Sequence, residues 1–191
     1  MHGGHLRAPM FLIGVLLLAL TSLVSPSTIY VCNGTFAGRD SGAANGSESN
    51  PYDDVAGAIS NGQAGDIFLL YEGTYYGAQN QQLEVAYPAS FIGISGAAST
   101  IFDGEVADNS WFMTISAVEV SLWNITFANG YNKNSLDSSG GALSVYGGAE
   151  LSVRDCVFVN NSAKASSGAV HLALNATGAA VFEGCAFRDN G

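Results

Sequence analysis

Side chains that carry out acid–base or metal chemistry are few in this sequence. Its 191 residues include 16 Asp and Glu against 6 Lys and Arg, which gives a formal net charge of −10. Such a surface repels phosphate backbones, so we expect no nucleic-acid partner.

The acidic stretch 103–108, DGEVAD, is the best candidate for a Ca²⁺ site, but it departs from the D-x-[DN]-x-[DN]-G spacing of calcium loops. A solvated acidic loop is the favoured interpretation, and we expect no cofactor, with Ca²⁺ as the alternative.

The sequence contains no recognisable set of catalytic residues. His171 is the only histidine beyond the N-terminal region, and it alternates to the outside of a predicted strand. Sequence spacing places no Ser or Cys nucleophile beside it, so a catalytic triad is unsupported. Asp53 and Asp54 are explained by the start of a helix, and Arg154 by a surface ion pair with Glu183. We therefore predict no catalytic residue and no metal ligand.

Residues 1–27 are predicted to be a signal peptide. Arg7 precedes an apolar run from Met10 to Val24, and small and polar residues follow it. The run is shorter than the roughly 20 residues that span a bilayer, although an uncleaved signal anchor is the alternative. We expect a secreted or cell-surface protein with no membrane span beyond this segment.

Secretion would make the N-x-S/T sequons candidates for glycosylation. The five candidates are Asn33, Asn45, Asn124, Asn160 and Asn175.

An internal repeat dominates the second half of the chain. The segments 120–129, 151–160 and 180–189 align with one another and place Phe127, Phe158 and Phe187 in one column, 31 and then 29 residues apart. Each unit holds short strands of alternating apolar and polar residues that are broken by Gly and Asn. A unit of this size cannot bury its own apolar face, so successive units must stack in register. The pattern predicts an all-β, single-stranded parallel β-helix with a Phe ladder in its core, in preference to an antiparallel sandwich.

The same alignment places Cys156 and Cys185 inside adjacent turns. Two buried thiols are the favoured interpretation. A disulfide is the alternative, because the spacing of neighbouring strands lies within the range that a disulfide allows.

The first half predicts a cap and then the solenoid. Residues 28–65 form the predicted N-terminal cap, with a short helix that Asn50 caps, that Pro51 begins and that Gly62 ends. Residues 66–191 form the predicted β-helix of roughly five coils. The sequence ends where another coil is expected, so we expect a truncated solenoid or an end that another chain covers.

The stretch 65–75, GDIFLLYEGTY, with the loop and helix before it, resembles the opening of pectin-lyase-like right-handed β-helix proteins, and 101–104 and 122–130 continue the likeness. The segments 140–143, 158–161 and 187–190 resemble the GGA[ILV] and FxxN repeats of chlamydial polymorphic outer membrane proteins, although 167–170 lacks the first Gly. The resemblance implies a right-handed β-helix and little about activity, because this fold hosts many activities.

Polysaccharide lyases and hydrolases share this fold, but the combination of NTD, DD and SHG motifs that polygalacturonases carry is absent from the sequence, where the one DD pair is explained by the helix start. We predict a non-catalytic protein with a structural, adhesive or glycan-binding role, whose partner is a polysaccharide, a cell-surface glycan or a protein. A polysaccharide lyase or glycoside hydrolase, whole or as a fragment, is the alternative.

Overall fold

The computed structural model describes residues 25–34, 42–133, 139–165 and 167–191. The predicted signal peptide 1–27 therefore lies almost entirely outside the described residues. Within the described part of the chain, no helix is both long and apolar enough to cross a bilayer.

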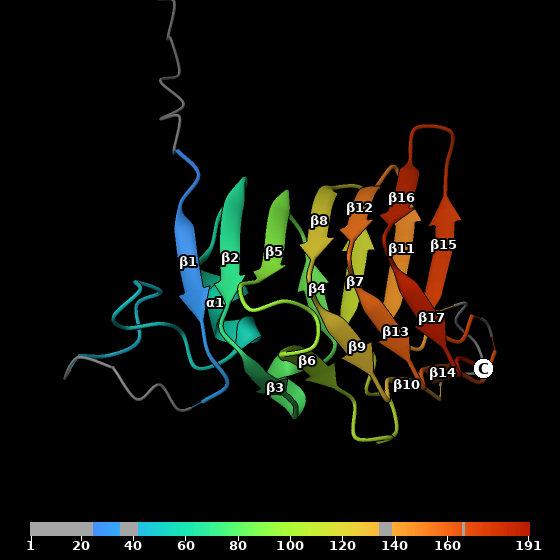
Figure 1. The fold of residues 1–191 in the computed structure, drawn as a ribbon. Coiled ribbons are helices and arrows are strands. Elements are labelled where there is room, and N and C mark those ends of the chain that lie inside the picture. Colours follow the sequence, from blue (N-terminus) through green and yellow to red (C-terminus); the bar gives the residue numbers. More distant parts are fainter. Residues whose placement is uncertain (1–24, 35–41, 134–138, 166) are drawn as a thin grey trace, which may run out of the picture.

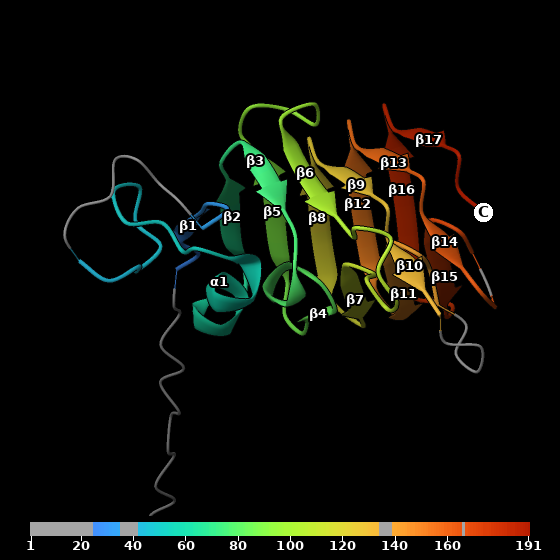
Figure 2. The same cartoon turned by 90° about the horizontal axis from the view of Figure 1, so that it is seen from below.

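The chain winds into a solenoid whose strands form three parallel sheets (Figures 1 and 2). The six-stranded sheet contains β1 (Thr28–Val31), β2 (Asp66–Leu70), β5 (Ala89–Gly93), β8 (Glu119–Trp123), β12 (Glu150–Arg154) and β16 (Ala179–Glu183). The five-stranded sheet contains β3 (Gly73–Tyr75), β6 (Thr100–Asp103), β9 (Thr126–Ala128), β13 (Val157–Val159) and β17 (Ala186–Arg188). The four-stranded sheet contains β4 (Leu83–Val85), β7 (Met113–Ser116), β11 (Leu143–Gly147) and β15 (Val170–Leu174). A short pair, β10 (Tyr131–Asn132) with β14 (Ser162–Ala163), joins two of the longer loops.

The strands visit the three sheets in a fixed order, which defines the turns of the helix. Each named ladder in the described residues is parallel, as a solenoid requires and a sandwich of hairpins does not. Four turns have a strand in each of the three sheets, and β16 with β17 begins another. The described residues therefore form four complete coils, one fewer than the roughly five predicted from the sequence.

The one α-helix among the described residues, α1 (Val55–Asn61), closes the solenoid beside β1 (Figure 2). Its N-cap is Asp54, whose carboxylate accepts a hydrogen bond from Gly57 N at 2.7 Å, so the predicted cap at Asn50 is wrong. The physical reason is that Tyr52 exchanges backbone hydrogen bonds with β1, which keeps the residues before Asp54 extended. Gly62 ends the helix as expected, and Val55 and Ala58 are buried against the core.

Aromatic rings fill the core as one continuous ladder along the five-stranded sheet. The ring centroids of Phe127 and Phe158 are 5.2 Å apart, and those of Phe158 and Phe187 are 4.8 Å apart. Tyr75 and Phe102, which the repeat alignment did not include, extend the ladder through the first turns. Four of the five rings are fully buried and Phe187, at the end of the stack, is 50% exposed.

Asn and Asp recur at fixed positions of the repeat because the chain makes two tight corners there. Asn124 and Asp155 occupy the left-handed region between the first two sheets, and Asn129, Asn160 and Asp189 occupy it at the end of the next strand. Asn and Asp tolerate this conformation better than other side chains that carry a Cβ. The backbone conformation of these corners therefore favours Asn and Asp at these positions.

The GGA segment has an equally structural explanation. A Cβ on Gly141 would collide with the carbonyl oxygen of Gly168 in the next turn, and one on Gly168 would collide with Gly191 N at 2.5 Å. Glycine at these positions lets successive turns approach closely.

Candidate functional site

A stripe of large side chains runs along the outer face of the six-stranded sheet. The register pairs Tyr30 with Leu69, Leu69 with Ile92, and Ile92 with Trp123. Because inward and outward positions alternate along each strand, these four side chains share the solvent side while the core lies beneath them. All four are partly exposed. We call Tyr30, Leu69, Ile92 and Trp123 the outer stripe.

A row of hydroxyl groups runs beside the outer stripe. Ser90, Ser121 and Ser152 are register partners on β5, β8 and β12, two residues before the positions that continue the stripe. Ser90, Ser121 and Glu119 line a shallow groove of about 210 Å³ that crosses β5 and β8. The face therefore offers apolar surface and hydrogen-bonding groups side by side.

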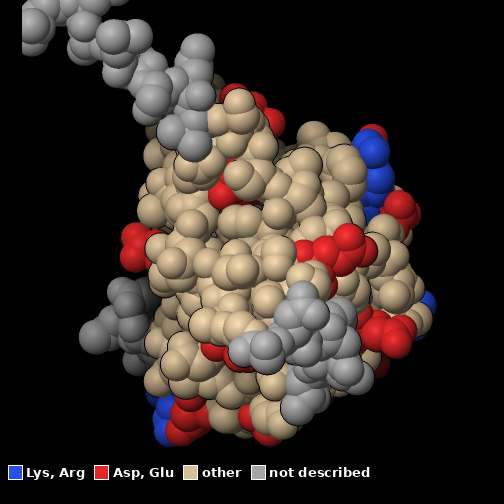
Figure 3. Space-filling view, turned by 90° about the vertical axis from the view of Figure 1, so that its left-hand side faces the viewer, with Lys and Arg blue, Asp and Glu red and all other residues tan. Residues whose placement is uncertain are grey.

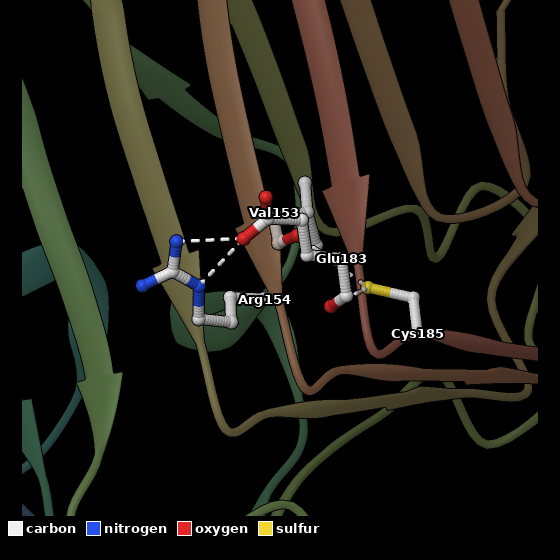
Figure 4. Close-up of polar contacts among 4 residues, drawn as sticks. All are labelled: Val153, Arg154, Glu183 and Cys185. Carbon is white, nitrogen blue, oxygen red and sulfur yellow. Dashed lines mark hydrogen bonds and ion pairs between the residues drawn. The ribbon is translucent and has the colours of Figure 1, made fainter.

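Arg154 lies next to Trp123 at the end of the outer stripe. Its guanidinium carbon is 5.5 Å from the centre of the Trp123 ring, and its Nη2 and Nε donate to Glu183 Oε2 at 2.6 and 3.0 Å (Figure 4). This ion pair is the one predicted from the sequence, and the exposure of both partners makes its contribution to stability small. Its local effect is to leave this end of the stripe with no net charge.

Acidic side chains outnumber basic ones elsewhere on the surface. In the view toward the β1 end of the solenoid, acidic side chains are scattered over an otherwise uncharged surface and basic ones are few (Figure 3). This agrees with the formal net charge of −10.

A second polar row lies on the outer face of the four-stranded sheet. Glu84 pairs with Thr114, Thr114 with Ser144, and Ser144 with His171. The register thus brings a serine beside His171, which sequence spacing could not show. The Ser144 hydroxyl is buried and accepts a hydrogen bond from Gly140 N at 3.1 Å, while the His171 ring lies 6.0 Å from that of Tyr146.

Two carboxylates of the acidic stretch 103–108 have partners within the loop or in the segment 129–133. Asp103 accepts hydrogen bonds from Glu105 N and from the Asn129 amide, at 2.8 and 2.9 Å. Asp108 forms an exposed ion pair with Lys133 at 2.6 Å. Among the residues that the structure describes, no group of three His, Cys, Asp or Glu side chains is arranged to hold a metal ion.

Cys156 and Cys185 lie at equivalent corners of successive turns, and both are free thiols. The Cys156 thiol lies 3.4 Å from the carbonyl oxygen of Leu122, and the Cys185 thiol lies 3.6 Å from that of Val153 (Figure 4). Each sulfur also lies beside a carbonyl oxygen of its own turn, that of Arg154 or Glu183. The alternative of a disulfide between the two cysteines stays a prediction.

The two thiols should differ in reactivity. The pKa of the Cys156 thiol is raised to about 12, and burial is the largest cause of this rise. The reactive thiolate is therefore scarce at Cys156 at neutral pH. Cys185 is partly exposed.

We expect an aromatic disulfide reagent at pH 8 to modify Cys185 at least about tenfold faster than Cys156 in the native protein. Peptide mapping after short labelling measures this, with urea-unfolded protein as the control in which both react alike. Equal native rates would contradict the placement of Cys156 in the core.

The five sequons lie in different surroundings. Asn33, Asn45, Asn160 and Asn175 are exposed, whereas Asn124 is partly buried at a corner. Glycan attachment at any of them stays a prediction.

Three parallel sheets stacked around one apolar core define the class of this protein as a parallel β-helix, and the following likeness identifies it as the right-handed, pectin-lyase-like kind. A solved structure titled rhamnogalacturonan lyase is similar to this chain with a TM-score of 0.51 and 17% sequence identity, over 84% of this chain and 51% of that one. At this identity the likeness shows the fold, and it confirms the predicted fold class. The chain spans about half the length of that lyase.

No protein-family model and no curated protein matches the chain. The likeness to chlamydial polymorphic outer membrane protein repeats therefore stays a resemblance of sequence.

Proposed function

We propose that this chain is a secreted or cell-surface β-helix protein that binds a glycan on the outer face of the six-stranded sheet and does not cleave it. The outer stripe, beside the serine row and its groove, is the observation that carries this proposal. The pectin-lyase-like fold is compatible with such a role but does not specify it.

The chemistry of this face suits a sugar chain. A sugar ring has apolar faces that pack on aromatic and aliphatic side chains, and it has hydroxyl edges that bond to groups such as Ser90, Ser121 and Glu119. Successive positions of the stripe lie about 4.8 Å apart, the separation of neighbouring strands, which is close to the rise of one sugar in an extended chain.

Charge favours a neutral glycan over an acidic one. Arg154 is the basic side chain next to the stripe, and Glu183 neutralises it. Glu119 and Glu150 are register partners at the edge of the same face and would repel a polyanion. We therefore expect neutral polysaccharides to bind in preference to polyuronates.

Replacement of Trp123 tests the proposal. We expect Trp123→Ala to weaken binding to immobilised neutral polysaccharide by up to about tenfold, the range for loss of one aromatic packing contact. The matched control is Tyr76→Ala, which removes a 58% exposed aromatic ring that follows β3 and lies outside the stripe. Affinity chromatography against a panel of neutral and acidic polysaccharides measures both variants. No retention of the wild-type protein, or equal losses in the two variants, would overturn the proposal.

Polysaccharide cleavage is the second candidate, because the four-stranded sheet brings Glu84, Ser144 and His171 into one outward row. We expect no product when neutral and pectic substrates are incubated with the protein, with or without Ca²⁺. Release of reducing ends or unsaturated products that disappears in Glu84→Gln or His171→Ala would instead establish a lyase or hydrolase.

A further inference from the structure

The sequon at residues 175–177 shares one feature with that at Asn45, whose Oδ1 accepts a hydrogen bond from Ser47 N at 3.0 Å, and it adds a bond from its own hydroxyl group. It occupies the turn between β15 and β16, where Asn175, Ala176 and Thr177 are all exposed. Asn175 Oδ1 accepts hydrogen bonds from Thr177 N at 2.9 Å and from the Thr177 hydroxyl at 2.8 Å. The carboxamide is therefore held through its oxygen by the sequon's own hydroxyl residue, and its nitrogen is not part of these bonds. This turn projects beyond the ends of the neighbouring strands (Figure 1).

The sequon at Asn124 is built into the solenoid. Ile125 is fully buried, and Thr126 is 9% exposed. The Thr126 hydroxyl donates to the carbonyl oxygen of Ala97 at 2.7 Å. A glycan is bulky and needs a surface site, whereas this tripeptide must pack into a corner of the core for the turn to form.

The sequon at Asn160 is tied to the neighbouring turns. Asn160 Nδ2, the atom that would carry the sugar, donates to Asn129 Oδ1 at 2.7 Å. The middle residue, Asn161, is fully buried and bonded to the preceding turn. A sugar on Asn160 would therefore be placed against the side chain of Asn129.

We propose that Asn175 is an N-linked glycosylation site of this protein and that Asn124 and Asn160 are not glycosylated in the folded chain. The inference needs a secretory route but not the glycan-binding role proposed above. Loss of binding activity and loss of the modification are therefore separate results.

Expression in a eukaryotic secretory cell tests the assignment. The full chain is produced with a heterologous leader added before Met1, so that entry into the pathway does not depend on the predicted signal peptide. We expect an electrophoretic mobility shift that peptide N-glycosidase removes, and enzymatic deglycosylation in ¹⁸O-labelled water should convert Asn175 to labelled Asp.

Two matched variants remove single sequons without altering an asparagine. Thr177→Ala should abolish the label at position 175, whereas Ser162→Ala, which removes the sequon of Asn160, should leave the mobility shift unchanged. Peptides are mapped from both the medium and the cell membranes, so that retention of a variant does not remove the reading. Absence of label at Asn175, or label at Asn124 or Asn160 in the secreted product, would overturn the assignment.

Discussion

Phe158→Ala is expected to lower the free energy of unfolding by about 3–5 kcal/mol, the range for deletion of a buried phenylalanine ring. The Phe158 ring is fully buried between the rings of Phe127 and Phe187, with centroid distances of 5.2 and 4.8 Å. Its removal leaves a cavity in the middle of the stack that rigid parallel strands cannot close. Urea unfolding followed by circular dichroism measures the loss.

Phe187→Ala is the matched control for this prediction. Phe187 occupies the equivalent position in the next turn, but it is 50% exposed. Its truncation removes less buried surface and should cost less than half as much, about 1–2 kcal/mol. Equal losses for the two variants would mean that Phe158 does not lie in a closed core.

Asn161→Ala is expected to lower the free energy of unfolding by about 2–4 kcal/mol, because it leaves two buried backbone groups without partners. The fully buried Asn161 side chain accepts a hydrogen bond from Gly130 N and donates to the carbonyl oxygen of Phe127, both at 2.9 Å. These bonds satisfy the corner of the preceding turn, where the chain cannot pair as a strand. The same urea titration measures this variant.

Asn190→Ala provides the comparison for Asn161. Asn190 makes the equivalent bond to the carbonyl oxygen of Phe158 at 3.0 Å, but it is only partly buried. Its Oδ1 also accepts hydrogen bonds from Asn161 N and Nδ2, both at 3.0 Å. Because Asn190 is partly exposed, water can take the place of its truncated side chain, and we expect a loss of about 1 kcal/mol or less. A larger loss at Asn190 than at Asn161 would contradict the structural role assigned to the FxxN asparagine.

The spacing of the phenylalanines was sufficient to predict the stacked fold. Phe127, Phe158 and Phe187 belong to turns of nearly equal length, so their column is visible as a repeat in the sequence. Tyr75 and Phe102 occupy the same column, but loops of different lengths separate them from it and from each other. Residue identity also changes from Phe to Tyr there, which hides the first turns from an alignment of repeats.

The candidate site could not be read from the sequence to the same extent. The ion pair of Arg154 with Glu183 could be predicted because both residues lie in the clear repeats. By contrast, Tyr30, Leu69 and Ile92 join the column of Trp123 only through a register set across unequal loops. The pairing of Ser144 with His171 was missed although these residues directly follow the aligned segments 140–143 and 167–170. Local spacing predicts which side of a strand a residue faces, and only the register shows what lies next to it.

The start of the helix was misplaced because two local signals compete. Asn50 followed by Pro51 is a strong helix start by composition, yet the pairing of Tyr52 with β1 holds this segment extended. Asp54 is then the first residue free to cap the helix. Long-range pairing therefore overrides the local preference.

In-register stacking of successive turns is tested most directly by disulfide cross-linking of outward positions. Ser121 and Ser152 are register partners on β8 and β12, so their Cα atoms should lie within the range that a disulfide spans. We expect Ser121→Cys with Ser152→Cys to form an intramolecular cross-link between these residues under mild oxidation, detected as a linked peptide pair by mass spectrometry. Ser121→Cys with Val181→Cys, two turns apart, should give no such link. A link in the second pair but not in the first would contradict the stacked arrangement on which the ladder and the outer stripe depend.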